Sequence, residues 1–213
     1  MRIIIITALF VALSFNSQAQ SLSDLFKSLT SSSSSTTTTE TTTSEPTTIP
    51  QLSKASLLGL WSFSKLAVGL AEGSSLQNMF GKAVISQVEN LVNSLSASNG
   101  IKEGMFSMTI FNDDILSVEF ENGAKANSPY TLNTEQSSLM VDIGTLNNIE
   151  IGALVATIAI TSESDITLLF DSKDLFAIAD QIPSIVENSQ YQMVKSTVSS
   201  LDGIMLGFKL KKI

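Results

Sequence analysis

Residues 105–123, MFSMTIFNDDILSVEFENG, contain two short segments in which apolar and polar side chains alternate. Because successive side chains of a strand point to opposite faces, this alternation predicts two strands, each with one apolar face. The polar residues 112–114 between the segments predict a turn. Asn122-Gly123 is the dipeptide that most strongly favours a second hairpin turn. The stretch therefore predicts consecutive antiparallel strands, with a third strand to follow.

Alternation of this kind recurs along the chain and predicts a mainly β fold. The six central strands are joined by connections too short for a crossover, which makes them antiparallel neighbours. Eight antiparallel strands can close into a small up-and-down barrel, and closure removes the exposed edges of an open sheet. The predicted strands are residues 57–67, 105–111, 115–121, 127–132, 138–143, 151–161, 165–171 and 203–212.

Two helical regions are expected between the strands. Apolar residues recur every three or four positions over 76–95, which predicts a long amphipathic helix after the first strand. A helical insertion is expected before the last strand, as one helix from Ser172, its cap, to a stop at Pro183, and a second over 184–201. Both regions fall near the seam where the barrel closes, so that one helix can cap an open end.

The N-terminal residues 1–19 have the layout of a secretory signal peptide. Arg2 precedes a short apolar run, and Ser17 and Ala19 stand at the small-residue positions before a cleavage point. The apolar run is shorter than the about 20 residues that a membrane-spanning helix needs. We therefore expect the protein to be exported, with the periplasm, the outer envelope and secretion all open as destinations, and with no transmembrane segment after cleavage.

Residues 20–51 are predicted to form a disordered spacer. Between residues 30 and 48, 16 of 19 positions are Ser or Thr, a composition that cannot bury enough apolar surface to offset the entropy of ordering. The barrel domain is accordingly expected to span residues 52–213.

Charge and composition exclude several functions. Without the leader the chain carries 11 lysines and no other basic residue against 20 acidic residues, a net charge of −9. A nucleic-acid binder needs a basic face and usually arginine, so no nucleic-acid partner is expected. The chain has no His and no Cys, so the commonest catalytic bases, nucleophiles and zinc ligands are missing. We expect no catalysis, no cofactor and no metal.

Three short patterns could suggest chemistry, and each has a simpler explanation. Ser62 and Lys65 fit the S-x-x-K pattern of serine acyl-enzymes, but they lie in a predicted strand and the companion motifs are missing. The adjacent Asp113 and Asp114 suit a hairpin turn. Acidic residues at 171 and 174 suit the start of a helix.

The residues Gly59-x-Trp61, the eight-strand meander and the leader together resemble the lipocalin-type barrels. The chain is more closely similar to the lipocalin-like families of unknown function exported by Bacteroidota, which share the leading G-x-W, a long helix after it and an ending like the MLGFKLKK of 205–212. The resemblance covers residues 57–212. Classical lipocalins pack an arginine near the last strand on the tryptophan, a position that a lysine such as Lys209 would take here, and their T-D-Y motif is absent.

Two functions remain open from the sequence. The first is a barrel that binds a small apolar or amphipathic ligand. The second is a non-catalytic structural or protein-interaction module of the envelope, with an envelope protein as partner and a barrel filled by its own side chains. Trp61 is expected mainly to pack in the core at a barrel end. The candidate ligand-binding residues of the interior are Trp61, Met108, Phe120, Tyr130, Met140, Phe170 and Phe208.

Overall fold

The computed structural model describes residues 51–72, 89, 93, 101–146, 149–187, 189–199 and 203–213. The predicted leader and nearly all of the predicted spacer lie outside the described residues, as does most of the predicted helix over 76–95. Glu89 and Asn93, the two described residues of that helix, are both helical.

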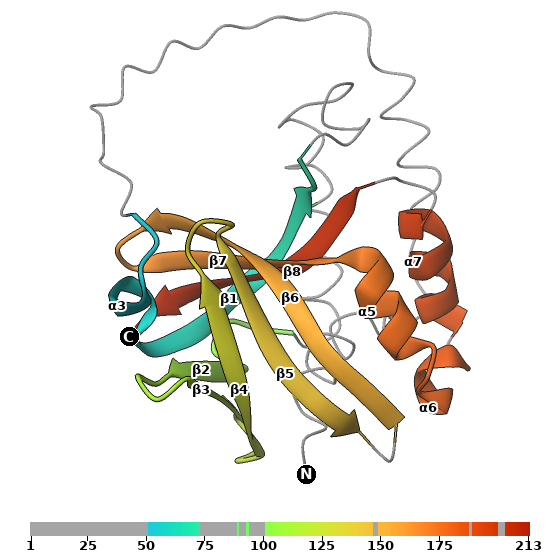
Figure 1. The fold of residues 1–213 in the computed structure, drawn as a ribbon. Coiled ribbons are helices and arrows are strands. Elements are labelled where there is room, and N and C mark those ends of the chain that lie inside the picture. Colours follow the sequence, from blue (N-terminus) through green and yellow to red (C-terminus); the bar gives the residue numbers. More distant parts are fainter. Residues whose placement is uncertain are drawn as a thin grey trace, which may run out of the picture.

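The eight strands form a closed barrel in which each strand pairs antiparallel with the next and β8 returns to pair with β1 (Figure 1). This confirms the predicted mainly β fold and the eight-stranded antiparallel barrel. The strand bounds are β1 (Gly59–Leu70), β2 (Phe106–Ile110), β3 (Ile115–Phe120), β4 (Lys125–Asn133), β5 (Ser138–Leu146), β6 (Ile149–Ser162), β7 (Asp165–Asp171) and β8 (Ile204–Lys212).

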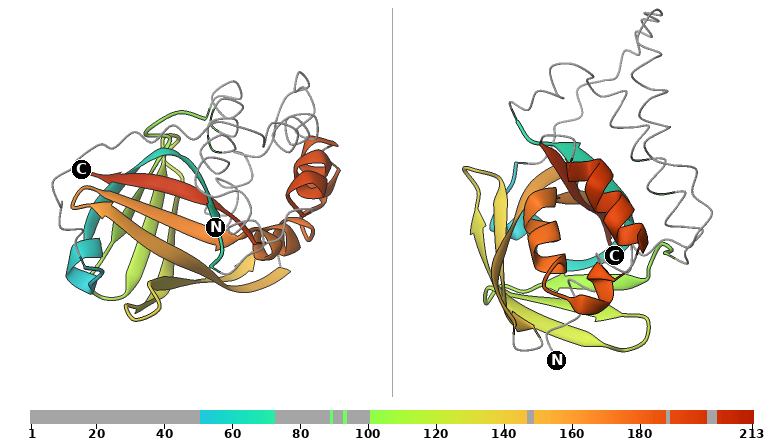
Figure 2. Two further views of the ribbon diagram at one scale, coloured as in Figure 1. Left: turned by 90° about the horizontal axis from the view of Figure 1, so that it is seen from above. Right: turned by 90° about the vertical axis from the view of Figure 1, so that its right-hand side faces the viewer.

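Apart from the helical residues Glu89 and Asn93, the described part of the chain has a short helix before the barrel and three helices after β7. Their bounds are α3 (Lys54–Leu57), α5 (Ser172–Ala179), α6 (Pro183–Val186) and α7 (Ser189–Ser199). Figure 1 shows α3 at one end of the barrel and α5, α6 and α7 at the other. In the right-hand view of Figure 2 these last three helices lie in front of the barrel's opening. Helices therefore lie at both ends of the barrel, the longer ones at the α5 end.

Helix α3 was not expected from the sequence. Ser53 and Ser56 form a capping box, in which each hydroxyl accepts a hydrogen bond from the other residue's backbone N–H. This cap starts the turn of helix that takes in Leu57, so the first strand begins at Gly59 rather than at Leu57. Capping boxes are usually sought with Glu or Gln at the fourth position, which is why a Ser-x-x-Ser pattern gave no signal.

The predicted bounds of the C-terminal helices need two corrections. The cap of α5 is Asp171 and not Ser172, because Asp171 Oδ1 accepts the backbone N–H of Lys173 at 2.8 Å while Ser172 is already helical. Pro183 is the first residue of α6 and not merely a stop after α5. Proline suits a first helical turn, where its missing N–H would have no partner in any case.

The barrel closes at a narrow seam between β7, β8 and β1. Gly207 of β8 lies opposite Ala67 of β1 and Leu169 of β7. A Cβ atom built on Gly207 would lie 1.8 Å from the backbone oxygen of Leu168, so no side chain fits there. A Cβ on Gly69 would lie 2.5 Å from Leu169 Cδ1, which is the end of a flexible side chain.

Asn93 takes the place of a strand partner on β1. Only the first four residues of β1 pair with β2, so that among the described strands none lies beside the β2-side edge of Leu66. The Asn93 side chain fills this position: its Oδ1 accepts from Leu66 N at 2.9 Å and its Nδ2 donates to Leu66 O at 3.0 Å. One amide thereby satisfies both backbone groups of an otherwise open strand edge.

Glu89 lies one helical turn before Asn93 and bridges two strands. Its Oε1 lies 3.1 Å from Lys65 Nζ of β1 and 2.8 Å from Lys209 Nζ of β8. Burial by itself raises the pKa of Glu89, but the two lysines together outweigh burial, so the pKa lies below its ordinary value of 4.5. The ionised form is therefore the one that the folded protein favours.

We expect the stability conferred by Glu89 to be fully present above about pH 5 and to be lost as the pH falls through its lowered pKa. The Glu89→Gln variant should lose about 1 kcal/mol at pH 7 and should show a flatter fall in stability between pH 5 and pH 3, as measured by urea unfolding. Glu119→Gln is the matched control, since Glu119 pairs with Lys125 on the exposed surface. Equal pH profiles for the two variants would contradict this role of Glu89.

Candidate functional site

The interior of the barrel is the first place to look for a ligand. A small cavity near its centre is bounded by Met108, Phe170 and Phe208, three of the candidate ligand-binding residues. Its walls are apolar throughout. The lining side chains are Phe106, Met108, Leu116, Val118, Leu139, Val141, Ile143, Leu154, Leu168, Phe170 and Phe208.

This central cavity has a volume of only about 30 Å³. A single water needs roughly 10–15 Å³ measured in this way, so the cavity has room for about two waters, which its apolar walls would not hold. Phenylalanine rings fill the space around it. The centroid of the Phe106 ring lies 5.0 Å from the centroid of Phe63, 5.8 Å from that of Phe120 and 5.5 Å from that of Phe208.

Trp61 lies at the α3 end of the barrel and does not line the central cavity. Its side chain is 1% exposed, and its Nε1–H donates to the backbone oxygen of Leu57 at 2.7 Å. The lysine that packs on its ring is Lys212, with Nζ 5.1 Å from the ring centre. The expectation for Lys209 is therefore wrong. Lys209 has the opposite strand parity and points to the outer face, where it pairs with Glu89.

Phe120 and Tyr130 also lie away from the central cavity. Phe120 is half-buried and packs its ring against Phe106. Tyr130 is buried, and its hydroxyl donates to the backbone oxygen of Phe111 at 3.0 Å. Burial raises the pKa of Tyr130, so its hydroxyl stays protonated at neutral pH. The two residues lie toward opposite ends of β3, since the backbone N–H of Tyr130 bonds to the Asp114 oxygen just before the strand begins and Phe120 is its last residue.

Met140 does not face the interior. Its side chain is 43% exposed, whereas its neighbours Leu139 and Val141 are buried and line the cavity. The expectation failed because both faces of β5 carry apolar residues at this point, so alternation alone did not decide which row faces inward. Met140 instead lies beside Val155 of β6 on the outer surface.

Helix α5 covers the end of the barrel opposite α3. Leu175, Phe176, Ile178 and Ala179 are buried and belong to the same core cluster as the barrel interior. These side chains form a single apolar face on a helix of about two turns. Anything that enters the barrel from this end must first displace that face.

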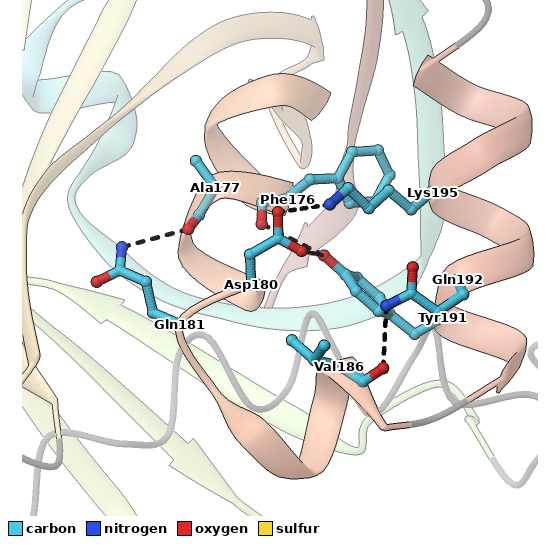
Figure 3. Close-up of polar contacts among 8 residues, drawn as sticks. All are labelled: Phe176, Ala177, Asp180, Gln181, Val186, Tyr191, Gln192 and Lys195. Atoms are coloured by element: carbon cyan, nitrogen blue, oxygen red, sulfur yellow. Dashed lines mark hydrogen bonds and ion pairs between the residues drawn. The ribbon is translucent and has the colours of Figure 1, made fainter.

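A polar cluster fastens α7 to α5 (Figure 3). Tyr191 of α7 donates to Asp180 Oδ1 at 2.8 Å, and Lys195 of the same helix donates to Asp180 Oδ2. The Tyr191 ring also packs edge-on against Phe176 of α5. The Lys195 ammonium and, to a smaller degree, the tyrosine hydroxyl lower the pKa of Asp180 against the effect of burial.

The cluster of Tyr191, Asp180 and Lys195 is suited to holding α7 against α5 and not to catalysis. Burial and the neighbouring Asp180 both raise the pKa of Tyr191, so the phenol stays protonated at neutral pH and acts as a hydrogen-bond donor. A nucleophilic or basic tyrosine would need the opposite shift. The sequence placed Tyr191 on a helix but offered no signal for its partner, because Asp180 lies at the end of a different helix, as the C-cap of α5.

Replacing Tyr191 by Phe should cost about 1–2 kcal/mol, because the variant leaves the Asp180 carboxylate short of one donor. Amide hydrogen exchange should speed up in α5 and α7 and stay unchanged in β2 and β3. The matched control is Tyr130→Phe, which removes the same hydroxyl at the other end of the barrel, where its acceptor is an uncharged backbone oxygen. Faster exchange of α7 in both variants would contradict a local fastening role.

Within the described part of the chain, no group of three or more acidic side chains lies close enough to hold a metal ion. No helix there is both long and apolar enough to cross a membrane. The absence of a cofactor and of catalysis stays a prediction.

The comparison with known families is clear, although no curated protein matches the chain. The family model of the lipocalin-like domain DUF4923 matches residues 26–212, which include all eight strands and extend upstream of the predicted domain start at 52. This confirms the resemblance to a lipocalin-like domain of unknown function, while an origin in Bacteroidota stays a prediction. With its closed eight-stranded barrel and a match over most of its length, the chain belongs to the DUF4923 family of lipocalin-like domains.

Proposed function

We propose that this protein is an exported, non-catalytic interaction module whose barrel is a scaffold filled by its own side chains. The observation that carries the proposal is the central cavity of about 30 Å³. Sites that enclose a small molecule usually measure about 300–1,000 Å³. The folded barrel therefore lacks the room that a lipid-like ligand would need at its centre.

Other parts of this proposal rest on the sequence. The leader over residues 1–19 supports export to the envelope, and the Ser/Thr-rich residues 30–48 would present the barrel at a distance from its anchor or partner. The lack of His and Cys supports a function without catalysis. A rigid, filled barrel suits such a role because it holds its outer surface in one shape.

Two methionine methyl groups can test the proposal. Met108 lines the cavity, and Met140 lies on the outer surface. We expect palmitate, titrated into protein with ¹³C-labelled methionine methyls, to leave the Met108 signal unmoved. Native mass spectrometry of protein from its own cells should show no bound lipid. A saturable shift of Met108 without a shift of Met140 would overturn the self-filled barrel.

One observation favours a second function, that of a carrier which opens to load its ligand. The walls of the cavity are wholly apolar, and the end above them is covered by α5, a short helix whose polar contacts to α7 include those of the Asp180 carboxylate. Displacing α5 would open the interior to an apolar guest. The same palmitate titration on Asp180→Asn decides the case, because a Met108 shift that appears in this variant and at higher ligand concentration in the parent protein supports the carrier.

A further inference from the structure

A second and larger pocket lies at the α3 end of the barrel, where the inward-facing rows of four strands finish. Its volume is about 390 Å³. Trp61 of β1 and Ile166 of β7 form its floor, together with Ile160 of β6. Ser56 of α3, Ser162 of β6, Glu163 of the β6–β7 turn and Lys212 of β8 complete the lining.

The inward row of β8 ends in a charge. Leu206, Phe208 and Leu210 are buried along this row, and the next residue of the same parity is Lys212. Lys212 lies opposite Trp61 in the β1–β8 register, which places both side chains on the same face of the sheet. Its ammonium group is held over the Trp61 ring and above the pocket floor.

Lys212 differs from the other lysines of β8 in its lack of a carboxylate partner among the described residues. The two lysines that precede it on β8 have carboxylate partners, since Lys209 pairs with Glu89 and Lys211 with Glu103. In the residues that the structure describes, no carboxylate pairs with Lys212. A cation at the mouth of an apolar cup, with hydroxyls on its walls, is the arrangement that a ligand with one anionic end and one apolar end requires.

The geometry points to a binding site for a small amphipathic carboxylate in this end pocket. The apolar tail packs mainly on Ile160, because Trp61 and Ile166 line the base of the pocket but are each only 1% exposed, and the carboxylate accepts a hydrogen bond from Lys212 Nζ. The pocket closes at Trp61 and Ile166, so the tail is short, of the length of hexanoate rather than of a long-chain fatty acid. This site goes beyond the proposed function, because it lies outside the filled centre of the barrel and needs no displacement of α5.

Glu163 suggests a competing ligand, which the test must distinguish from a carboxylate. Its carboxylate also lines the pocket, so an amine with the same tail is the competing ligand chemistry. Hexanoate, hexylamine and hexanol share one tail and differ only in the charge of the head group. The proposal requires that hexanoate bind the most tightly of the three.

The experiment titrates the three probes into the full chain and follows two signals, the fluorescence of Trp61 and the amide NMR shifts of β6 and β8. The fluorescence reports this site alone, because Trp61 is the chain's only tryptophan. We expect saturable binding of hexanoate, about tenfold tighter than hexanol, the difference that one charge-assisted hydrogen bond supplies. Lys212→Met should reduce hexanoate binding to the level of hexanol, and Lys212→Arg should restore most of it. Lys211→Met, which removes the adjacent charge from the outer face, should leave binding unchanged.

Tighter binding of hexylamine than of hexanoate would overturn the assignment, as would equal binding of hexanoate by the parent protein and Lys212→Met. Absence of saturable hexanoate binding would overturn it as well. The Met108 methyl signal keeps this outcome distinct from failure of the proposed function, since Met108 reports the centre of the barrel and the β8 amides report its end.

Discussion

The Gly207→Ala variant should lose about 3 kcal/mol or more of folding free energy, the largest effect expected of a single added methyl group. The cause is space and not backbone conformation, because the new Cβ would meet the backbone oxygen of Leu168 at 1.8 Å. A backbone oxygen within a paired strand cannot move without breaking the ladder between β7 and β8. Urea unfolding and the yield of soluble protein measure the effect.

Two other glycines serve as controls for this prediction. Gly69→Ala meets only the end of the Leu169 side chain and should cost less, since a leucine can change rotamer. Gly123→Ala has open space around it but a φ of +77°, so it should cost about 1 kcal/mol through conformation alone. A Gly207→Ala variant as stable as Gly123→Ala would show that the seam between β7 and β8 is looser than the structure has it.

The second large effect is expected from Phe106→Ala. Removing this ring should cost about 3–5 kcal/mol, because the ring contacts three other phenylalanines and the space left behind cannot collapse. The new space joins the central cavity that Phe106 lines. Engineered apolar cavities of about 150 Å³ bind benzene, so the variant should gain saturable benzene binding, seen as a shift of the Met108 methyl signal.

Phe111→Ala is the matched control, since Phe111 is the residue after the end of β2 and is 44% exposed. It should change stability by no more than about 0.5 kcal/mol and should not bind benzene. Phe106→Leu retains more of the fold if the alanine variant proves too unstable, and it should show a smaller loss. Equal stability of Phe106→Ala and Phe111→Ala would contradict a tightly filled barrel.

The barrel itself could be predicted from local signals. Alternating residues such as Met108 and Val118, together with short polar turns, determine strands and their antiparallel order, and the number of strands then determines closure. The ends of the helices were harder to predict, because capping depends on single side chains. Asp171 and Ser172 are both good caps, and only the structure shows which one accepts the backbone N–H.

The candidate site was predictable only in part, since it depends on how full the barrel is. Met108, Phe170 and Phe208 face the interior as expected and line the central cavity, while their part in ligand binding stays a prediction. No pattern in a sequence reports whether large inward side chains leave space or fill it. The inward orientation expected for Met140 was wrong because its strand is apolar on both faces. Lys212 was overlooked as an inward residue because a lysine at the end of an alternating strand is ordinarily assigned to solvent.

The pairing of β1 with β8 has a consequence for the time course of folding. The ring of strands is closed by contacts between the two ends of the barrel sequence, so the most distant segments must meet before the outer edges of β1 and β8 are protected. Such non-local closure makes for high contact order and slow folding. A nascent chain that lacks β8 would hold two open edges, and it would be a substrate for chaperones and for edge-to-edge association until its last strand arrives.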